Sequence, residues 1–436
     1  MLLIRNGVLI DPASQREGEF DLLVDGSVIK DVGTRGSFDH ASVENTVELN
    51  GHWIVPGLID LHVHLREPGQ EWKETILTGS RAAVLGGYTS VCCMPNTVPA
   101  IHSEEIVEYV LEKASKANLA RVHPIGAVTI ERAGKELAPL TELREAGCVA
   151  FSDDGDPVFN AGVMRRALEW AKSLDAVISC HEEDKSLSCC GSMNESPLSY
   201  QMGEVGFPKV AEEVMIARDI ELARTTGARV HICHVSSGRG VELIRRAKND
   251  GINITAEVTP HHLALTEDAI LEFHTQAKMS PPLREELERE LLFEGVLDGT
   301  IDCIASDHAP HENDSKELEF SEASMGILGL QTSLPLMLDF IQKQKISRLQ
   351  AIMALACRPA QVFGLPYGTL CKGAQADITV IDPNYEWTYQ VQDNVSKSVN
   401  SPFLNRKFTG RVEQVFVGGR SVVRDGVLSK ESLNDR

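Results

Sequence analysis

The sequence DLHVHLREP at residues 60–68 closes an apolar run that starts at Trp53. The run at residues 53–65 is short, rich in branched side chains and followed by the turn-forming sequence EPGQ, so it predicts one buried β-strand. Residues i and i+2 of a strand point to the same face, which places His62 and His64 side by side. They could share one metal ion, or they could be hydrogen-bonded histidines of the core. The presence of further metal-ligand residues in the sequence has to distinguish these alternatives.

The chain then repeats a pattern of short apolar runs and helical segments. Seven further strand-like runs lie at residues 89–96, 121–128, 148–155, 176–183, 229–236, 252–262 and 302–311. Amphipathic segments with apolar residues three and four apart lie between them, for example residues 103–117, 161–174, 207–227 and 238–251. Eight β-then-α units over roughly 250 to 300 residues predict an α/β protein built on a (β/α)8 TIM-like barrel. An open doubly wound sheet is the alternative, but no Gly-rich phosphate loop follows the first strand.

The two ends of the chain differ from this middle part. Both contain short strand-like runs, and Asn-Gly and Asp-Gly turns separate those near the N-terminus. Neither end alone provides enough apolar residues for a core. We therefore expect residues 1–54 and 366–436 to pair into one small composite β-sandwich domain, with the barrel at residues 55–365 inserted between them.

Composition excludes several classes of function. The net charge of −21 and the lack of basic runs argue against nucleic acid or an anionic membrane as partner. No apolar stretch approaches a membrane span, and the N-terminal sequence is too interrupted for a secretory signal, so we expect a cytoplasmic protein. The ten cysteines show no C-x-x-C spacing, which suits reduced thiols. Cys180 and Cys233, each beside a histidine, are alternative soft metal ligands, although strand alternation points them away from those histidines.

Five predicted strands end in an imidazole or a carboxylate. These residues are His62, His64, Asp153, Asp154, His181, His234 and Asp307. Functional side chains of such barrels come from the C-terminal ends of the strands, so we expect one shared site. Four His and two Asp suit Zn²⁺, with Co²⁺ or Mn²⁺ as weaker alternatives, and six donors exceed the need of one tetrahedral ion. Alternation sends the two neighbouring aspartates to opposite faces, which leaves open which of them is the ligand.

Seven segments resemble the signature segments of the dihydroorotase family, in its bacterial type I form, within the amidohydrolase superfamily. They read DLHVHLREPG, MPNT, FSDDG, CHVSS, TAEVTPHHL, KMSPPLR and ASDHAPH, and the similarity continues through GLPYGTLCKGAQADITVID to cover most of the chain. Two departures stand out: Ser280 replaces an asparagine, and HEED replaces the common HCED. Neither departure touches a predicted metal ligand.

The resemblance implies a role for each site residue. It assigns His62, His64 and Asp307 to a first zinc ion and His181 and His234 to a second, with Asp154 bridging them in place of a carboxylated lysine. It further assigns the carboxylate of the substrate to Arg66, Asn96 and His311, and a ring contact to Ser280. Arg66 lies two residues beyond His64, so it stays on the metal face if the strand remains extended. Glu67 receives no role, and His261 and His262 are open between site and core.

The resemblance also implies a reaction. It is the reversible, zinc-dependent hydrolysis of the cyclic amide of (S)-dihydroorotate to N-carbamoyl-L-aspartate, the third step of de novo pyrimidine biosynthesis. One or two Zn²⁺ ions are expected, with two favoured, and Asp307 is expected to transfer the proton as the catalytic residue. We expect no organic cofactor, a homodimer, and association with aspartate transcarbamoylase as a further option.

Two other functions compete with this one. Another cyclic amidohydrolase, such as dihydropyrimidinase, hydantoinase or allantoinase, resembles the chain but uses a carboxylated lysine and lacks the carboxylate clamp. A non-catalytic subunit that scaffolds aspartate transcarbamoylase loses metal ligands, whereas all six positions are filled here. Residues 311–326 form a long polar segment after the last strand, and we expect it to close over the substrate as a lid.

Overall fold

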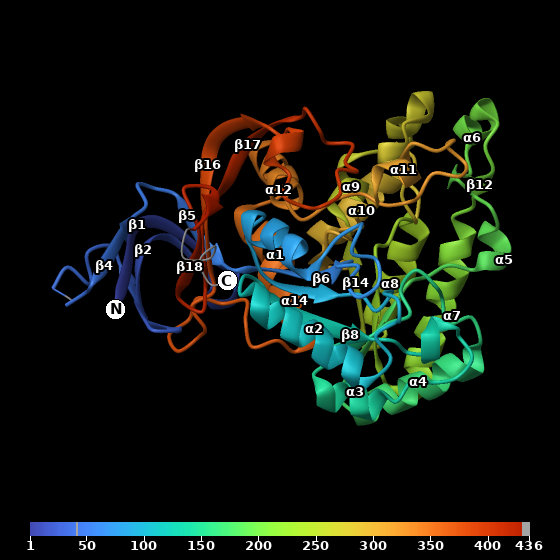
Figure 1. Cartoon of the computed structure of the whole chain (residues 1–436), viewed down its shortest axis with the longest axis horizontal. Coiled ribbons are helices and arrows are strands. Elements are labelled where there is room, and N and C mark those ends of the chain that lie inside the picture. The colour runs from blue at the N-terminus through green and yellow to red at the C-terminus, as the bar shows by residue number, and fades with distance from the viewer. Residues whose placement is uncertain (41, 430–436) are drawn as a thin grey trace.

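The computed structural model describes residues 1–40 and 42–429. Its centre is an eight-stranded parallel barrel whose strands run in the spatial order of the sequence (Figure 1). The strands are β6 (Leu58–Val63), β7 (Tyr88–Cys93), β8 (Arg121–Gly126), β9 (Ala150–Phe151), β10 (Val177–Cys180), β13 (Arg229–Ile232), β14 (Ile254–Val258) and β15 (Cys303–Ile304). A parallel bridge between Val63 and His308 brings the last strand beside the first, so the barrel is nearly closed. The predicted fold class is therefore confirmed.

Helices cover the outside of the barrel. The longer ones are α1 (Ile76–Leu85), α2 (Glu104–Ala117), α3 (Leu140–Ala146), α4 (Ala161–Ser173), α7 (Val210–Thr226), α8 (Gly238–Asn249), α10 (Glu286–Leu297) and α12 (Ser333–Gln342). Shorter ones are α5 (Lys185–Ser188), α6 (Pro197–Met202), α9 (Pro260–Ala264), α11 (Asn313–Lys316), α13 (Arg348–Ile352) and α14 (Arg358–Phe363), and β11 (Met193–Asn194) pairs with β12 (Gly206–Phe207). The four amphipathic segments named above correspond to α2, α4, α7 and α8.

The opening run is two strands, which corrects the prediction of one. It divides at Gly57 into β5 (Trp53–Pro56) and β6. Gly57 donates its backbone N–H to the carbonyl of Asp377, and a Cβ there would lie 2.2 Å from the Thr89 side chain. The chain therefore changes sheets at the one residue type that this close approach allows.

Glu67, which had no predicted role, holds the start of α1. Its carboxylate accepts hydrogen bonds from the backbone N–H of Ile76 at 2.9 Å and from the hydroxyl of Tyr109 at 3.0 Å, and it pairs with Lys113 at 2.9 Å. A carboxylate at a helix N-terminus satisfies a free N–H group and complements the helix dipole. The glutamate beside Arg66 thus anchors the loop that carries the arginine.

Both chain ends build a single nine-stranded mixed sheet on one side of the barrel (Figure 1). The N-terminal strands are β1 (Leu2–Asp11), β2 (Arg16–Asp25), β3 (Val28–Thr34), β4 (Asn45–Glu48) and β5, and the C-terminal strands are β16 (Ile378–Thr388), β17 (Lys407–Val417), β18 (Arg420–Arg424) and β19 (Val427–Leu428). Antiparallel pairing of β5 with β16 joins the two ends. The domain boundaries at 54/55 and 365/366 stay a prediction, and the sheet itself extends to Pro56.

None of the helices in the described part of the chain is both long and apolar enough to span a membrane.

Candidate active site

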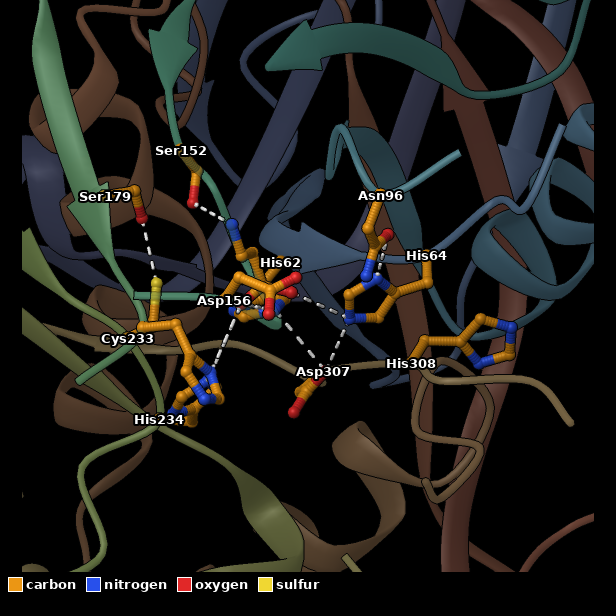
Figure 2. Close-up of polar contacts among 12 residues, drawn as sticks. His62, His64, Asn96, Ser152, Asp156, Ser179, Cys233, His234, Asp307 and His308 are labelled. Atoms are coloured by element: carbon orange, nitrogen blue, oxygen red, sulfur yellow. Dashed lines mark hydrogen bonds and ion pairs between the residues drawn. The ribbon is translucent and has the colours of Figure 1, made fainter. Parts of the chain in front are cut away.

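Six side chains meet at the C-terminal end of the barrel strands. His62 lies on β6, and His64, Asp154, His181, His234 and Asp307 follow the ends of β6, β9, β10, β13 and β15. Each of the six is at most 8% exposed. Figure 2 shows His62, His64, His234 and Asp307 directed toward one centre. The structure thus brings together all six residues that the sequence analysis assigned to the metal centre.

Asp154 occupies the middle of this cluster. One of its carboxylate oxygens lies 3.3 Å from Nε2 of His62 and 3.7 Å from both Nδ1 of His181 and Nε2 of His234, and the other lies 3.6 Å from Nε2 of His64. Asp307 lies 3.0 Å from His64 and 3.4 Å from His62, measured between Oδ1 and Nε2. Two groups of potential ligand atoms result, one of His62, His64 and Asp307 and one of Asp154, His181 and His234.

Asp153, the residue before Asp154, faces away from the cluster. Oδ1 of Asp153 accepts the backbone N–H groups of Val128 at 2.8 Å and Thr129 at 3.0 Å. Asp153 therefore ties the strand end of β9 to the loop after β8, whereas Asp154 faces the histidines. Strand alternation predicted that the two point apart, and the structure shows which one lies in the cluster.

Three of the four histidines are oriented by partners that the sequence analysis did not predict in this role. Nδ1 of His62 lies 2.7 Å from Glu257, Nδ1 of His64 lies 2.8 Å from Asn96, and Nε2 of His181 lies 3.0 Å from Glu183. An oxygen acceptor fixes the proton on the ring nitrogen that it faces, so the opposite nitrogen presents a lone pair to the centre. Glu257 also contacts Nε2 of His231 at 3.1 Å and is fully buried.

Glu257→Gln is expected to weaken metal binding tenfold to a hundredfold, roughly the effect of removing an outer partner of a metal ligand. The substitution keeps the shape but removes the charge that holds the His62 ring. The dissociation constant can be measured by competition with a chromophoric chelator. Asp60→Asn is the matched control, because Asp60 is equally buried but accepts backbone N–H groups of His62 and Ser306. Equal weakening in both variants would contradict the role of Glu257.

The cluster has the properties of a cation site. Nε2 of His62 and Oδ1 of Asp154 are buried and have no hydrogen-bond partner within the described structure. Burial alone would raise the pKa of Asp154, but the facing His62, His181 and His234 hold it well below its usual value. Nδ1 of His181 and Nε2 of His234 lie 3.0 Å apart, which suits two lone pairs directed at a shared ion. A buried set of imidazole and carboxylate donors fits zinc.

Three site residues adopt left-handed backbone conformations. The φ angles are 32° at His234, 43° at Asp307 and 60° at Arg66. This region is sparsely populated by residues other than glycine, and it reverses the direction in which the side chain leaves the strand. The extended geometry expected beyond His64 therefore does not persist. Arg66 nevertheless reaches the site, because the turn at its own backbone directs it there.

One cavity of about 200 Å³ is lined by the predicted substrate contacts and by every residue of the cluster except His62. Arg66, Asn96, Ser280 and His311 line it together with Asp307. The guanidinium of Arg66 donates from Nε to the carbonyl of Pro310 at 3.2 Å and faces Nε2 of His311 at 3.3 Å. Burial and the charge of Arg66 lower the pKa of His311 to about 2, so this imidazole is neutral. A cation, an amide and a neutral imidazole thus line the cavity beside the cluster.

Three other residues that the sequence analysis considered for the site, His261, His262 and Cys233, do not line the cavity. His262 contacts Thr259 at 2.7 Å and the carbonyl of Pro281 at 3.0 Å, and neither it nor His261 lines the cavity. Cys233 is closer than expected: its Sγ lies within 4.8 Å of ligand atoms of His62 and Asp154, because the left-handed turn at His234 breaks the alternation. It also contacts the hydroxyl of Ser179 at 2.9 Å (Figure 2).

Two buried lysines donate hydrogen bonds to backbone carbonyls of the segment at residues 311–326, whose His311 and Met325 line the cavity. Nζ of Lys316 donates to the carbonyls of Ser324 at 2.8 Å and Gly326 at 3.1 Å. Nζ of Lys278 donates to the carbonyls of Phe320 and of Ser321, the latter at 2.9 Å. Burial, reinforced by Lys278, lowers the pKa of Lys316 to about 7. The sequence alone gives no sign of this, since a lysine in a polar segment normally faces solvent.

Lys316→Met is expected to remove a pH-dependent part of the stability. The pKa of Lys316 is about 7 in the folded chain, below its usual 10.5, so between these values the unfolded state binds the extra proton. Stability from this group therefore rises with pH, by up to about 1.4 kcal/mol per unit. Urea unfolding at pH 7, 8 and 9 should show the wild-type advantage over Lys316→Met growing with pH. The exposed Lys116→Met is the control, and a pH-independent difference for Lys316→Met would refute the assignment.

Known proteins resemble the chain in sequence and fold. A family model described as dihydro-orotase-like matches residues 51–239. The dihydroorotase of Pelobacter propionicus is 47% identical over 97% of this chain and 99% of its own length, and that of Geobacter sp. strain M21 is 45% identical over 98% and 100%. Among solved structures, an L-hydantoinase (dihydropyrimidinase) from Arthrobacter aurescens matches with a TM-score of 0.89 at 24% identity, over 98% of this chain and 97% of its own, which shows a shared fold.

Proposed function

This chain belongs to the dihydroorotase family, and on that premise we propose that its cavity binds (S)-dihydroorotate and hydrolyses the cyclic amide reversibly to N-carbamoyl-L-aspartate. The observation that carries the proposal is the position of Arg66. A buried guanidinium shares one small cavity with Asp307 and the cluster of metal ligands. A substrate with both a ring amide and a carboxylate can contact both the cluster and Arg66, whereas a neutral cyclic amide offers the guanidinium no carboxylate to pair with.

We propose that the cluster holds two Zn²⁺ ions. His62, His64 and Asp307 would hold the first, His181 and His234 the second, and Asp154 both. The unpartnered nitrogen of His62 and oxygen of Asp154 support this assignment, because a buried polar atom without a partner is costly unless a ligand satisfies it. When bound, such an ion polarises a carbonyl oxygen and lowers the pKa of water to about 7.

The protein side chains then position the substrate and transfer protons. The fork of Arg66, the amide of Asn96 and the imidazole of His311 would bind the carboxylate and orient the ring over the cluster. Ser280, on the same cavity wall, would contact the ring. Asp307 would accept the proton of the attacking water and deliver it to the departing ring nitrogen, and the same transfer in reverse would serve cyclisation.

We further propose a homodimer, association with aspartate transcarbamoylase, a cytoplasmic location and a place in pyrimidine biosynthesis. The family resemblance supports these assignments. Sedimentation of the purified chain, alone and with the transcarbamoylase, tests the first two.

A substrate panel tests the central proposal against related cyclic amide hydrolases. Zinc-loaded protein should turn over dihydroorotate in preference to dihydrouracil, hydantoin and allantoin, because only dihydroorotate engages Arg66 through a carboxylate. Metal content should be measured in the same preparation, so that an empty site is not mistaken for the wrong substrate. Faster turnover of the neutral rings by zinc-loaded protein would favour a hydantoinase-like function.

A further inference from the structure

Two adjacent cysteines, Cys189 and Cys190, are exposed on the surface. Cys189 and Cys190 follow α5 directly, and their Sγ atoms are 3.5 Å apart. Both are exposed, whereas Cys371 is intermediate and the other seven cysteines of the described residues, at positions 92, 93, 148, 180, 233, 303 and 357, are buried. A reagent in solution therefore meets this pair first, and it meets two thiols already in contact.

The geometry of adjacent residues disfavours a disulfide between them. Consecutive Cα atoms are about 3.8 Å apart across a trans peptide, while unstrained disulfides span roughly 4.4 to 6.8 Å. A third atom placed between the two sulfurs removes this conflict, because each sulfur then bonds to the bridging atom and the 3.5 Å separation needs little change.

We propose that Cys189 and Cys190 form a two-thiol site for thiophilic electrophiles that make two bonds to sulfur, of which trivalent arsenicals are the type. With an organoarsenic oxide, both S–H bonds break and two As–S bonds form. The two protons leave with the oxide oxygen as water, and arsenic stays trivalent. The step balances without an oxidant or reductant.

Two residues, Ser188 and Glu183, connect this site to His181 of the cluster. Ser188, next to Cys189, donates its hydroxyl to one carboxylate oxygen of Glu183. The other oxygen of Glu183 lies 3.0 Å from Nε2 of His181, and Glu183 lines the active-site cavity. An organoarsenic group on Cys189 and Cys190 adds bulk and a covalent restraint at the residue after Ser188. Occupancy should therefore disturb the partner that orients His181, a consequence that rests on the proposed function.

Mass spectrometry with phenylarsine oxide tests the site itself. We expect one equivalent on the folded, zinc-loaded wild type, removed by excess dimercaptopropanol, and none on Cys189→Ser or Cys190→Ser. Cys371→Ser is the matched control and should bind like wild type. No adduct on the wild type, an equal adduct on either single variant, or an adduct abolished by Cys371→Ser would overturn the proposal. A mass loss of two protons without arsenic would show that the pair closes as a disulfide instead, and would also overturn it.

Turnover of dihydroorotate tests the coupling separately. The arsenical should lower kcat/KM of the wild type by up to about tenfold, the lower end for disturbed outer partners of metal ligands, with zinc content unchanged. Turnover should recover once the dithiol has removed the arsenical, the dithiol has been dialysed away and zinc has been restored. Cys190→Ser should be active and insensitive. Binding without any loss of turnover would overturn the coupling and leave the site intact. Absence of dihydroorotate turnover before treatment would count against the proposed function, while the mass measurement would still decide the site.

Discussion

Asp154→Ala is expected to lose at least one metal equivalent and to lower kcat by about a thousandfold or more. The substitution removes the carboxylate that approaches all four histidines of the cluster. The group with His181 and His234 therefore loses a member, and His62 and His64 lose a neighbouring carboxylate. Metal assistance in amide hydrolysis is worth several kcal/mol, and about 4 kcal/mol corresponds to a thousandfold. Metal analysis and turnover of dihydroorotate on the same preparation measure both effects.

Asp153→Ala is the control that distinguishes the loss of a metal ligand from the loss of a structural hydrogen-bond acceptor. Its carboxylate is as buried as that of Asp154 but accepts backbone N–H groups of Val128 and Thr129. Its loss should cost about 1 to 3 kcal/mol of stability, the usual penalty for a buried donor left without a partner, and should leave bound metal unchanged. If Asp153→Ala lost more metal and turnover than Asp154→Ala, the assignment of the bridging carboxylate would be wrong.

Arg66→Ala is expected to lower kcat/KM for dihydroorotate by roughly thirtyfold to several thousandfold. Loss of one partner of a buried charge pair costs about 2 to 5 kcal/mol, and each 1.4 kcal/mol is about tenfold. Arg66 is only 7% exposed, so solvent screens its attraction to a bound carboxylate weakly. Arg66→Lys should recover part of the loss, because a point charge does not reproduce the planar fork.

A neutral substrate tests whether Arg66 acts by pairing with the carboxylate of the substrate. Dihydrouracil has the ring amide but no carboxylate, so its turnover should respond much less to Arg66→Ala. Bound zinc should be equal in wild type and variant. Equal losses for both substrates, or a fall in zinc, would show that Arg66 supports the metal ligands or the fold and does not bind the substrate carboxylate.

The sequence predicted the barrel and the cluster because polar residues at the ends of apolar runs are easy to recognise. His181, His234 and Asp307 each follow a run too apolar to face water, and parallel strands bring their ends together. Arg66 was assigned by the family resemblance and by strand alternation, and the alternation argument was wrong. Alternation assumes an extended chain, and a left-handed turn at a single residue is a local backbone choice that no periodic pattern records.

The buried partners of the cluster, the lysines of the neighbouring segment and the break at Gly57 were harder to predict. Glu257 had one available signal, a carboxylate inside the apolar run at residues 252–262, since a buried charge needs a partner. Lys278 and Lys316 had none, because their partners are backbone carbonyls and every residue has one. Gly57 divides the opening run for a reason that depends on Thr89 of the neighbouring strand, which the run itself does not reveal.

The pairing of β5 with β16 has a consequence for the order of events during synthesis. About 320 residues separate Pro56 from Ile378, yet Val55 lies opposite Thr379 in the finished sheet. At about 5 to 20 residues per second, a ribosome needs about 15 to 65 s to supply the second strand after the first has emerged. For that interval the N-terminal part of the sheet exposes an unpaired edge to other nascent chains. A messenger RNA that is truncated within the region coding for the barrel yields a polypeptide without β16, and the edge of β5 then stays unpaired.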